Sequence, residues 1–330
     1  ANKIWNAARL VFMNVDKLTE SGIPVLTVFA EKSRTAASEP GLTSFEAATL
    51  EDRWILSRFN HVAGEINGAL KEYRFHEAAN SIYSFFWGEF CDWYLELIKP
   101  RLAAIGTDAG KRSARMEAVN MVAIFEGALR LLSPFMPFLT EELWQAVYDG
   151  APPKQSIALS TYPQSEPRQI DAHAETEMAI LQDLIVSVRN LRAELKIEPR
   201  QRLEIEVFTD ADVKGLIESN RGALERLPGT NVEKINFVGE SLAKKTQSRH
   251  TTRFDVRVVY EQKVDVEAER ARLQKEVERL EKGVARAEQQ LGNEAFLAKA
   301  PEKVVEGLRK NAAELKVLLE KARESRNQLG

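Results

Sequence analysis

The sequence predicts a mainly α-helical protein with a helical bundle, a small α+β domain and a C-terminal antiparallel coiled-coil hairpin. Three observations lead to this fold class. Apolar residues recur every three or four positions in the first part of the chain, short alternating runs follow, and a seven-residue apolar repeat fills the end. We therefore expect three domains, at residues 1–150, 151–261 and 262–330.

The predicted bundle begins with an apolar stripe that opens at Ile4 and Trp5. Because no capping residue precedes this stripe, we expect the sequence to be a piece of a longer chain. Residues 22–43 are rich in Gly, Pro, Ser and Thr and predict a connection between helices. Thr140 predicts the start of a later short helix, since a hydroxyl suits a helix N-terminus.

Three long helical stripes lie between these segments, and their spacing favours helices packed on a shared core. They comprise Leu50, Trp54, Ile55, Phe59, Val62 and Ile66; Phe75, Ala79, Ile82, Tyr83, Phe86, Phe90, Trp93, Tyr94 and Leu97; and Met116, Val119, Val122, Phe125, Leu129 and Leu132.

The predicted α+β domain follows a boundary at Ala151, Pro152 and Pro153. A helix is expected from about Asp171 to Lys196. Alternating apolar residues then predict three strands. They are Leu203, Ile205 and Val207; Ile235, Phe237 and Val238; and Phe254, Val256 and Val258.

The end of the chain has the apolar seam of two coiled-coil helices. The first seam comprises Val266, Leu273, Val277, Leu280, Val284, Ala287 and Leu291, and the second comprises Val304, Leu308, Leu315, Leu318, Ala322 and Leu329. Gly292, Asn293 and Pro301 lie between them and predict a reversal, so the two helices are expected to run antiparallel.

Composition limits the possible functions. A formal net charge of −3 gives no global reason to expect a nucleic-acid partner, so such a partner must be bound by local patches. A single cysteine, Cys91, excludes an internal disulfide and a multi-cysteine zinc site. No apolar run approaches the roughly 20 residues that a membrane span needs. We therefore expect a cytoplasmic protein without a membrane partner.

Catalytic patterns are missing from the sequence. It contains no Gly-rich phosphate loop, no nucleophile elbow and no histidine pair at helical spacing. We therefore expect no catalytic residue, no metal site and no cofactor in this chain, and no enzymatic activity of the chain alone.

Three segments together resemble the anticodon-binding domain that valyl, isoleucyl and leucyl class I aminoacyl-tRNA synthetases share. They are residues 2–9 (NKIWNAAR), 89–96 (EFCDWYLE) and 131–144 (LLSPFMPFLTEELW). The tail, at residues 264–276 and 291–301, is similar to the C-terminal coiled-coil arm of the valyl enzymes. Isoleucyl enzymes often end in a cysteine-ligated zinc unit instead, which one cysteine cannot form. The sequence thus resembles the C-terminal part of a bacterial valyl-tRNA synthetase.

This resemblance implies a tRNA-recognition role. The bundle would bind the anticodon stem-loop of valine tRNAs, and the arm would bind the tRNA elbow, where the D and T loops meet. The family's His-Ile-Gly-His and Lys-Met-Ser-Lys-Ser signatures do not occur here. ATP and Mg²⁺ are therefore implied only for a full-length enzyme, and we expect this chain to be a monomer.

Candidate RNA-binding residues in the bundle are basic, amide-bearing or aromatic, because such groups contact phosphates, base edges and base faces. They are Asn2, Lys3, Asn6, Arg9, Asn14, Trp87, Lys99 and Arg101. The polar ones could equally form a solvated helix face or meet a catalytic domain. Most of the crowded aromatic residues at 85–94 are expected to lie in the core, and Trp87 is the one singled out for base stacking.

Candidate residues in the arm are Arg270, Arg272, Lys275, Arg279, Lys282, Lys299 and Lys303. Their contact with RNA should be mostly to phosphates and sensitive to salt. Acidic residues are interleaved with them, so a solubilising role is the alternative for each. For the whole chain, the alternative is a structural or protein-interaction module that uses the hairpin for assembly.

Overall fold

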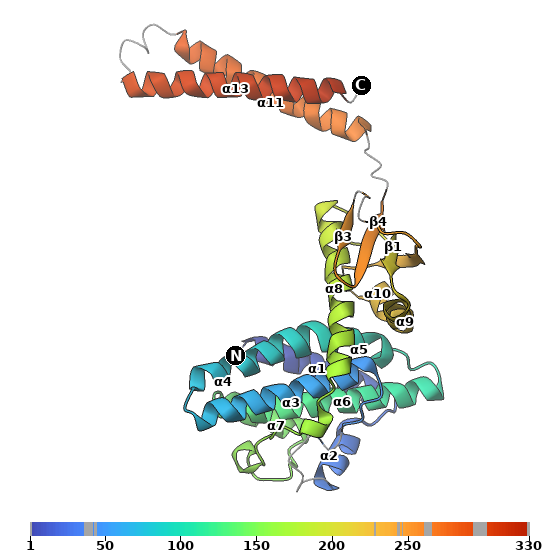
Figure 1. The fold of residues 1–330 in the computed structure, drawn as a ribbon. Coiled ribbons are helices and arrows are strands. Elements are labelled where there is room, and N and C mark those ends of the chain that lie inside the picture. Colours follow the sequence, from blue (N-terminus) through green and yellow to red (C-terminus); the bar gives the residue numbers. More distant parts are fainter. Residues whose placement is uncertain are drawn as a thin grey trace. The chain divides into compact units, whose positions relative to one another are not determined.

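The computed structural model divides into two compact units, Ala1–Val259 and Tyr260–Gly330, and each is described by itself (Figure 1). It describes residues 2–35, 42, 45–227, 229–242, 245, 247–260, 266–292 and 302–328. The predicted boundary between residues 150 and 151 falls inside the first unit and stays a prediction.

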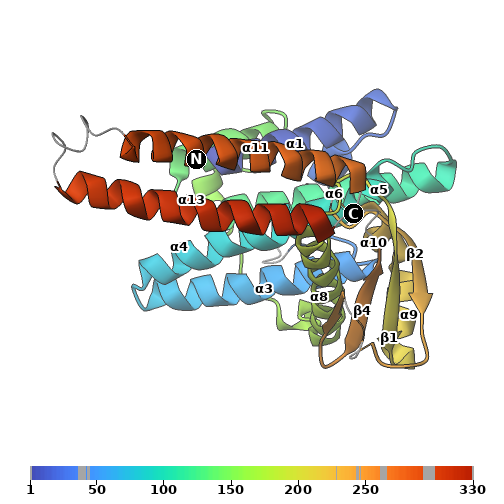
Figure 2. The ribbon, with the colours of Figure 1, turned by 90° about the horizontal axis from the view of Figure 1, so that it is seen from above.

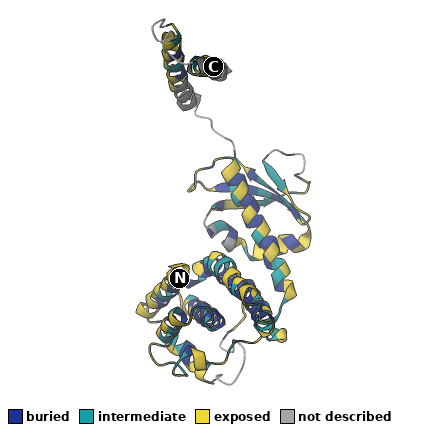
Figure 3. Ribbon diagram, turned by 90° about the vertical axis from the view of Figure 1, so that its left-hand side faces the viewer, coloured by how far each residue is buried: buried dark blue, intermediate teal, exposed yellow. Residues whose placement is uncertain are grey.

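Helices α1 to α7, with the π-helix η1, form the predicted bundle. Their bounds are α1 Asn2–Glu20, α2 Leu26–Thr35, α3 Leu50–Lys71, α4 Phe75–Ser84, η1 Phe85–Tyr94, α5 Leu95–Leu102, α6 Asp108–Leu132 and α7 Pro137–Val147. Figure 2 shows α3, α4 and α6 alongside one another, and α6 at the centre is buried almost throughout its second half. Figure 3 shows buried residues where the bundle helices face one another and exposed residues on their outer sides.

Local capping fixes where two of the long helices begin. The Thr49 side chain accepts a hydrogen bond from the Asp52 amide at 3.2 Å, and the Asp52 carboxylate accepts from the Thr49 amide at 3.3 Å, which is a reciprocal capping box at the start of α3. Thr107 caps α6 by accepting from the Gly110 amide at 3.0 Å. These caps satisfy amides that would otherwise lack an intrahelical partner.

Two predicted helix limits were wrong. Helix α2 lies within residues 22–43, which were predicted as a connection. Its Phe29 is 1% exposed and packs on the Tyr148 ring with 5.5 Å between centroids, so tertiary burial outweighs a weak local pattern. Helix α7 begins at Pro137 rather than Thr140, because proline suits the first helical turn.

The aromatic stretch at 85–94 forms a π-helix rather than a regular α-helix. The Leu95 amide donates to the Phe90 carbonyl, five residues earlier, at the end of this segment. Phe85, Phe86, Phe90 and Tyr94 are buried, while Trp87 and Trp93 are half-buried. The prediction that most of these aromatics lie in the core is therefore confirmed.

Two aromatics that were predicted on the core-facing stripe are exposed. Phe75 and Tyr83 of α4 are each 54% exposed. The stripe that contains them is wider than the face that α4 buries, so the residues at its rim remain in solvent.

In its described residues, the remainder of the first unit contains α8 (Ala172–Glu194), a mixed sheet, two short α-helices and two 3-10 helices. The bounds are η2 Ile157–Leu159, η3 Pro167–Gln169, β1 Leu203–Thr209, α9 Ala211–Ser219, α10 Arg221–Arg226, β2 Val232–Phe237, β3 Ser248–His250 and β4 Phe254–Val259. The strand order is β2-β1-β4-β3, with β1 parallel to β2 and antiparallel to β4. The three predicted strands are confirmed, whereas β3 is short and polar and was not predicted.

Helix α8 packs against both the bundle and the sheet, as Figure 1 shows. It contacts α3 near its beginning and β3 and β4 further along. Asp171 caps α8 by accepting from the Ala174 amide at 2.9 Å, and the same carboxylate pairs with Arg53 of α3 at 3.0 Å. One side chain therefore starts α8 and ties it to the bundle.

The second unit is a two-helix hairpin of α11 (Val266–Leu291) and α13 (Glu302–Gln328). Val277, Leu280 and Val284 of α11 are buried against Leu319 of α13, so the predicted seam on the first helix is confirmed at these positions. On the second helix Leu319 and Ala312 are buried, although the predicted seam omitted both. They lie four residues after Leu315 and Leu308, which preserves a heptad register.

Candidate nucleic-acid interface

Helix α1 presents four of the predicted residues on one exposed side. Its apolar face, which includes Ile4, Ala7, Ala8 and Val11, is buried in the bundle. The opposite side exposes Asn2, Lys3, Asn6 and Arg9. These residues offer two cationic and two amide side chains to solvent, a combination that suits phosphate oxygens and base edges.

Asn14 differs from the other α1 candidates. Its side chain is half-buried, and its amide donates to the Leu10 carbonyl at 2.8 Å. One of its donors is therefore already used within the helix.

The structure brings Lys3 and Trp87 together although they lie far apart in the sequence. The Lys3 ammonium lies 3.8 Å from the centroid of the Trp87 ring. A cation at this distance is attracted to the face of the indole by about 0.5–1 kcal/mol at an exposed site. Lys3 of α1 and Trp87 of η1 thus form one composite surface.

An open pocket of about 560 Å³ lies beside this pair. It is lined by Asn2, Lys3, Ile4, Ala79, Tyr83, Leu132, Phe135 and Met136. Its volume is in the range of small-ligand pockets, and its lining is mostly apolar, with polar groups from Asn2, Lys3 and Tyr83. Such a pocket can take up a flat ring and hold its polar edge at Asn2 or Lys3.

Sequence reasoning missed Tyr83, Phe135 and Met136 as parts of this pocket. Tyr83 was assigned to the core, and the other two belong to the turn before α7. No local pattern distinguishes an aromatic that lines a pocket from one that fills a core, so the sequence carried no usable signal for them.

The two candidates near the end of α5 have partners within the protein. Lys99 is exposed and pairs with Glu96. Arg101 pairs with Glu117 and, at 3.3 Å, with Glu51, whose side chains are 0% and 6% exposed. Its guanidinium therefore serves the interior of the bundle, which supports a structural role over a phosphate contact.

Burial and mutual repulsion perturb this carboxylate cluster. Burial raises the pKa of Glu117 to about 7, and the nearby Asp52 adds to this shift. Burial also raises the pKa of Asp52, against the hydrogen bonds that it accepts from Thr49 and Tyr94. Arg101 lowers both values because its positive charge favours the ionised carboxylates.

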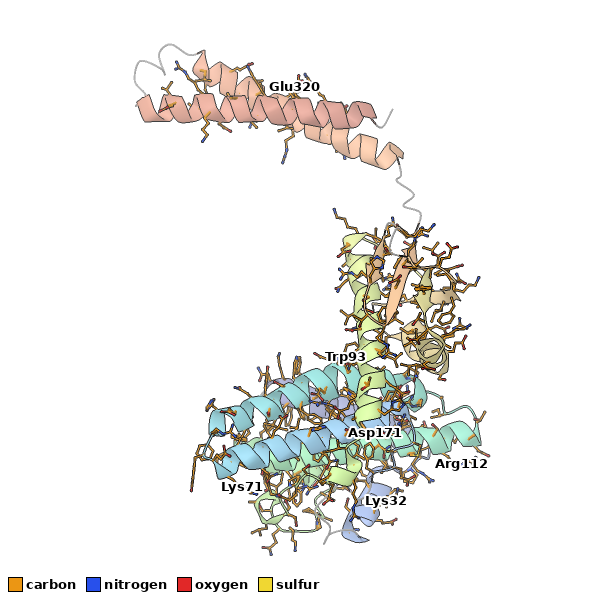
Figure 4. The ribbon with its side chains drawn as sticks, in the orientation of Figure 1. Lys32, Lys71, Trp93, Arg112, Asp171 and Glu320 are labelled. Carbon is orange, nitrogen blue, oxygen red and sulfur yellow. The ribbon has the colours of Figure 1, made fainter. Side chains whose placement is uncertain are left out.

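A second aromatic of η1 faces α8. The Arg189 guanidinium lies 5.5 Å from the Trp93 ring centroid, and Figure 4 shows Trp93 beside α8. Trp93 therefore belongs to the contact between the bundle and α8, which leaves Trp87 as the aromatic of η1 that meets a candidate residue of α1.

In the hairpin, Lys275, Arg279 and Lys282 are exposed on α11. The structure describes the helical backbone at Arg270, Arg272 and Lys303 but not their side chains. Lys299 lies outside the described residues. Among the described side chains, Glu281 pairs with Arg323 and Glu288 with Lys316 across the two helices, each at 2.7 Å. The three described candidates take no part in these ion pairs.

Neither a metal site nor a membrane span is found in the described part of the chain. No group of three or more His, Cys, Asp or Glu side chains among those residues is placed to hold a metal ion. No helix among them is long and apolar enough to cross a membrane.

Two family models match the chain, one in each compact unit. Residues 52–207 match the anticodon-binding domain of tRNA ligase. Residues 265–330 match the valyl tRNA synthetase tRNA binding arm. The first match runs from α3 through α8 into β1, so it includes the helix that joins the bundle to the sheet.

Curated relatives are similar along nearly the whole chain. The valine–tRNA ligase of Solibacter usitatus is 40% identical over 97% of this chain and 33% of its own length. Those of Thermotoga maritima and Bacillus subtilis are each 35% identical over 93% of this chain, and the matches cover 31% and 32% of their lengths. The chain thus spans about a third of the length of these relatives. Together with the two family models, these matches place the chain in the valyl-tRNA synthetase family, of which it matches a C-terminal part.

Proposed function

We propose that this chain is the tRNA-recognition part of a valine–tRNA ligase. The bundle binds the anticodon stem-loop, and the hairpin binds the elbow of the same tRNA. The observation that carries the proposal is that two family models, each described by a role in tRNA recognition, match two separate compact units. A longer enzyme would add the catalytic domain and, with ATP, attach valine to the tRNA.

On the bundle, the proposed contact is the surface formed by Lys3, Trp87 and the adjoining pocket. Unstacked bases of an RNA loop bind to aromatic faces and guanidinium planes, and the anticodon is such a loop. Asn6 and Arg9 continue the exposed side of α1 and would meet the flanking phosphates. The geometry supports one base held at the pocket and a backbone that follows α1.

On the hairpin, Lys275, Arg279 and Lys282 would bind phosphates of the elbow without reading bases. The alternative role of the hairpin in protein assembly is not favoured, because the model that matches it is described as a tRNA binding arm. We expect a monomer that acts in the cytoplasm on valine tRNAs.

The test combines footprinting of a valine tRNA transcript with two sets of variants. Trp87→Leu should weaken binding about 5- to 150-fold and abolish protection of the anticodon loop, since stacking contributes about 1–3 kcal/mol per base. Lys275→Gln/Arg279→Gln/Lys282→Gln should abolish protection of the elbow and leave the anticodon protected. Lys3→Arg is the matched control, because it keeps a cation over Trp87, whereas Lys3→Gln removes it.

An isolated anticodon stem-loop separates the two contacts. It should respond to Trp87→Leu and be indifferent to the hairpin variant. Protection of neither the anticodon loop nor the elbow by the unsubstituted chain would refute the proposal.

A further inference from the structure

A short basic loop follows α8 and has no role in the function proposed above. Residues 196–202 expose three cations, Lys196, Arg200 and Arg202, and one acid, Glu198. None of the three cations forms an ion pair within the part of the chain that the structure describes. The cations are therefore available to an external anion, unlike Arg101 or Arg53 in the bundle.

A buried arginine holds this loop in place from within. Arg192 of α8 is 4% exposed. Its Nη1 donates to the carbonyls of Gln201 at 2.9 Å and Thr230 at 3.2 Å, and its Nη2 donates to the carbonyl of Glu198 at 2.8 Å. Carbonyls of the loop thus turn inward to Arg192. These carbonyl oxygens, which carry partial negative charge, therefore point inward, while the cationic side chains of the loop remain in solvent.

Further contacts restrict the loop. The Asn231 side chain donates to the Pro199 carbonyl. Ile197 is 7% exposed, and its amide donates to the Arg192 carbonyl at 3.0 Å. Because the backbone is already ordered, a ligand that binds here would lose little of its affinity to ordering the loop.

The loop lies at a defined end of the sheet. Arg202 directly precedes β1, and Glu204 near the start of β1 pairs with Val259 at the end of β4. The last strand of the sheet, β4, therefore ends at the same end at which the loop lies. At the opposite end, Thr209 of β1 pairs with Phe254 of β4.

We propose that residues 196–202 form a third tRNA contact, at which Lys196, Arg200 and Arg202 bind phosphates of the RNA backbone independently of sequence. The proposal rests on the function proposed above and adds a site to it. Three exposed cations without an ion-pair partner among the described residues, on an ordered loop, suit phosphate oxygens, and the loop offers no aromatic ring for stacking. Its expected role is to position the RNA rather than to select it.

The test compares two double variants of this chain, each of which removes two exposed cations from the part of the first unit that contains the sheet. The test variant is Arg200→Gln/Arg202→Gln. The control is Lys214→Gln/Arg253→Gln, which lies at the opposite end of the sheet. Binding of a valine tRNA transcript is measured by filter retention between 50 and 300 mM KCl, and hydroxyl-radical footprints are recorded alongside.

The test variant should lower the slope of log K against log salt by about 1–2, because each lost phosphate contact contributes roughly 0.7–0.9. It should also lose protection of a backbone segment while the anticodon loop and the elbow stay protected. The control should retain the slope and the footprint. If the test and control variants gave the same salt slope and the same footprint while Trp87→Leu still weakened binding, the third contact would be overturned and the proposed function would stand. A parent chain that fails to bind the tRNA would overturn both proposals.

Discussion

Replacing Arg101 with methionine removes the cation that buried carboxylates of the bundle share. Glu117 is fully buried, Glu51 is nearly so, and Asp52 beside them accepts a hydrogen bond from the Tyr94 hydroxyl at 2.9 Å. Methionine fills much of the same space without a charge. The substitution therefore isolates the electrostatic contribution of the guanidinium.

The expected loss at pH 8 is about 3–5 kcal/mol in the free energy of unfolding, the usual cost of removing one partner from a buried ion pair. The loss should shrink with acidification. Burial already raises the pKa of Glu117 from 4.5 to about 7, so the folded state binds its proton more tightly than the unfolded state does. Without Arg101 this pKa rises further, and the variant therefore gains more stability than the parent as pH falls.

Urea unfolding followed by tryptophan fluorescence is the appropriate assay. All five tryptophans lie between residues 5 and 144, so the signal reports the bundle and not the hairpin. Lys99→Met on the same helix is the control, and its loss should stay below about 1 kcal/mol because Lys99 forms an exposed pair. A loss for Arg101→Met below about 1 kcal/mol, or one of equal size at pH 5.5 and pH 8, would refute the reasoning.

Three further predictions concern single positions. In the parent, the free energy of unfolding should fall as pH rises from about 4.5 to 7, because Glu117 has a raised pKa in the folded state and loses its proton there. Glu117→Gln should make this fall smaller, as urea titrations across that range would show. Gly110→Ala should destabilise the bundle by about 1–3 kcal/mol in the same assay, since its Cβ would lie 1.9 Å from the Ala104 carbonyl oxygen. Leu280→Asp should remove the helical circular-dichroism signal of the hairpin and leave the tryptophan transition unchanged.

Each of these predictions has an outcome that contradicts it. An unchanged pH profile for Glu117→Gln would mean that its carboxyl does not titrate in this window. A stability equal to that of the parent would contradict the steric argument at Gly110. A shifted tryptophan transition for Leu280→Asp would show that the hairpin and the first unit unfold together.

Helices and strands that bury one continuous face were predictable from the sequence, because the spacing of their apolar residues follows that face. The stripe from Leu50 to Ile66 became α3, and the alternation at Leu203, Ile205 and Val207 became β1. Helix α2 was not predictable in this way, since its stability depends on Phe29 meeting Tyr148 from far along the chain. The π-helix likewise depends on how the aromatics pack, which spacing does not record.

The candidate interface was predictable in its residue types but not in its grouping. Lys3 and Trp87 were selected separately, and only the folded structure reveals that the Lys3 ammonium lies over the Trp87 ring. Arg101 was selected for its charge, while the carboxylates that engage it come from two other helices. Arg192 was not selected, because a clamp on backbone carbonyls requires no acidic residue that could reveal it in a sequence.

Helix α8 has a consequence for how this region can be divided. A cut before residue 172 would remove from α3 the helix that packs against it. A cut after residue 194 would remove from β3 and β4 the same helix, and would leave the apolar face of α8 uncovered on the bundle. The bundle and the sheet should therefore be expressed together as one folding unit. The hairpin has its own apolar core and could be exchanged between relatives without disturbing the first unit.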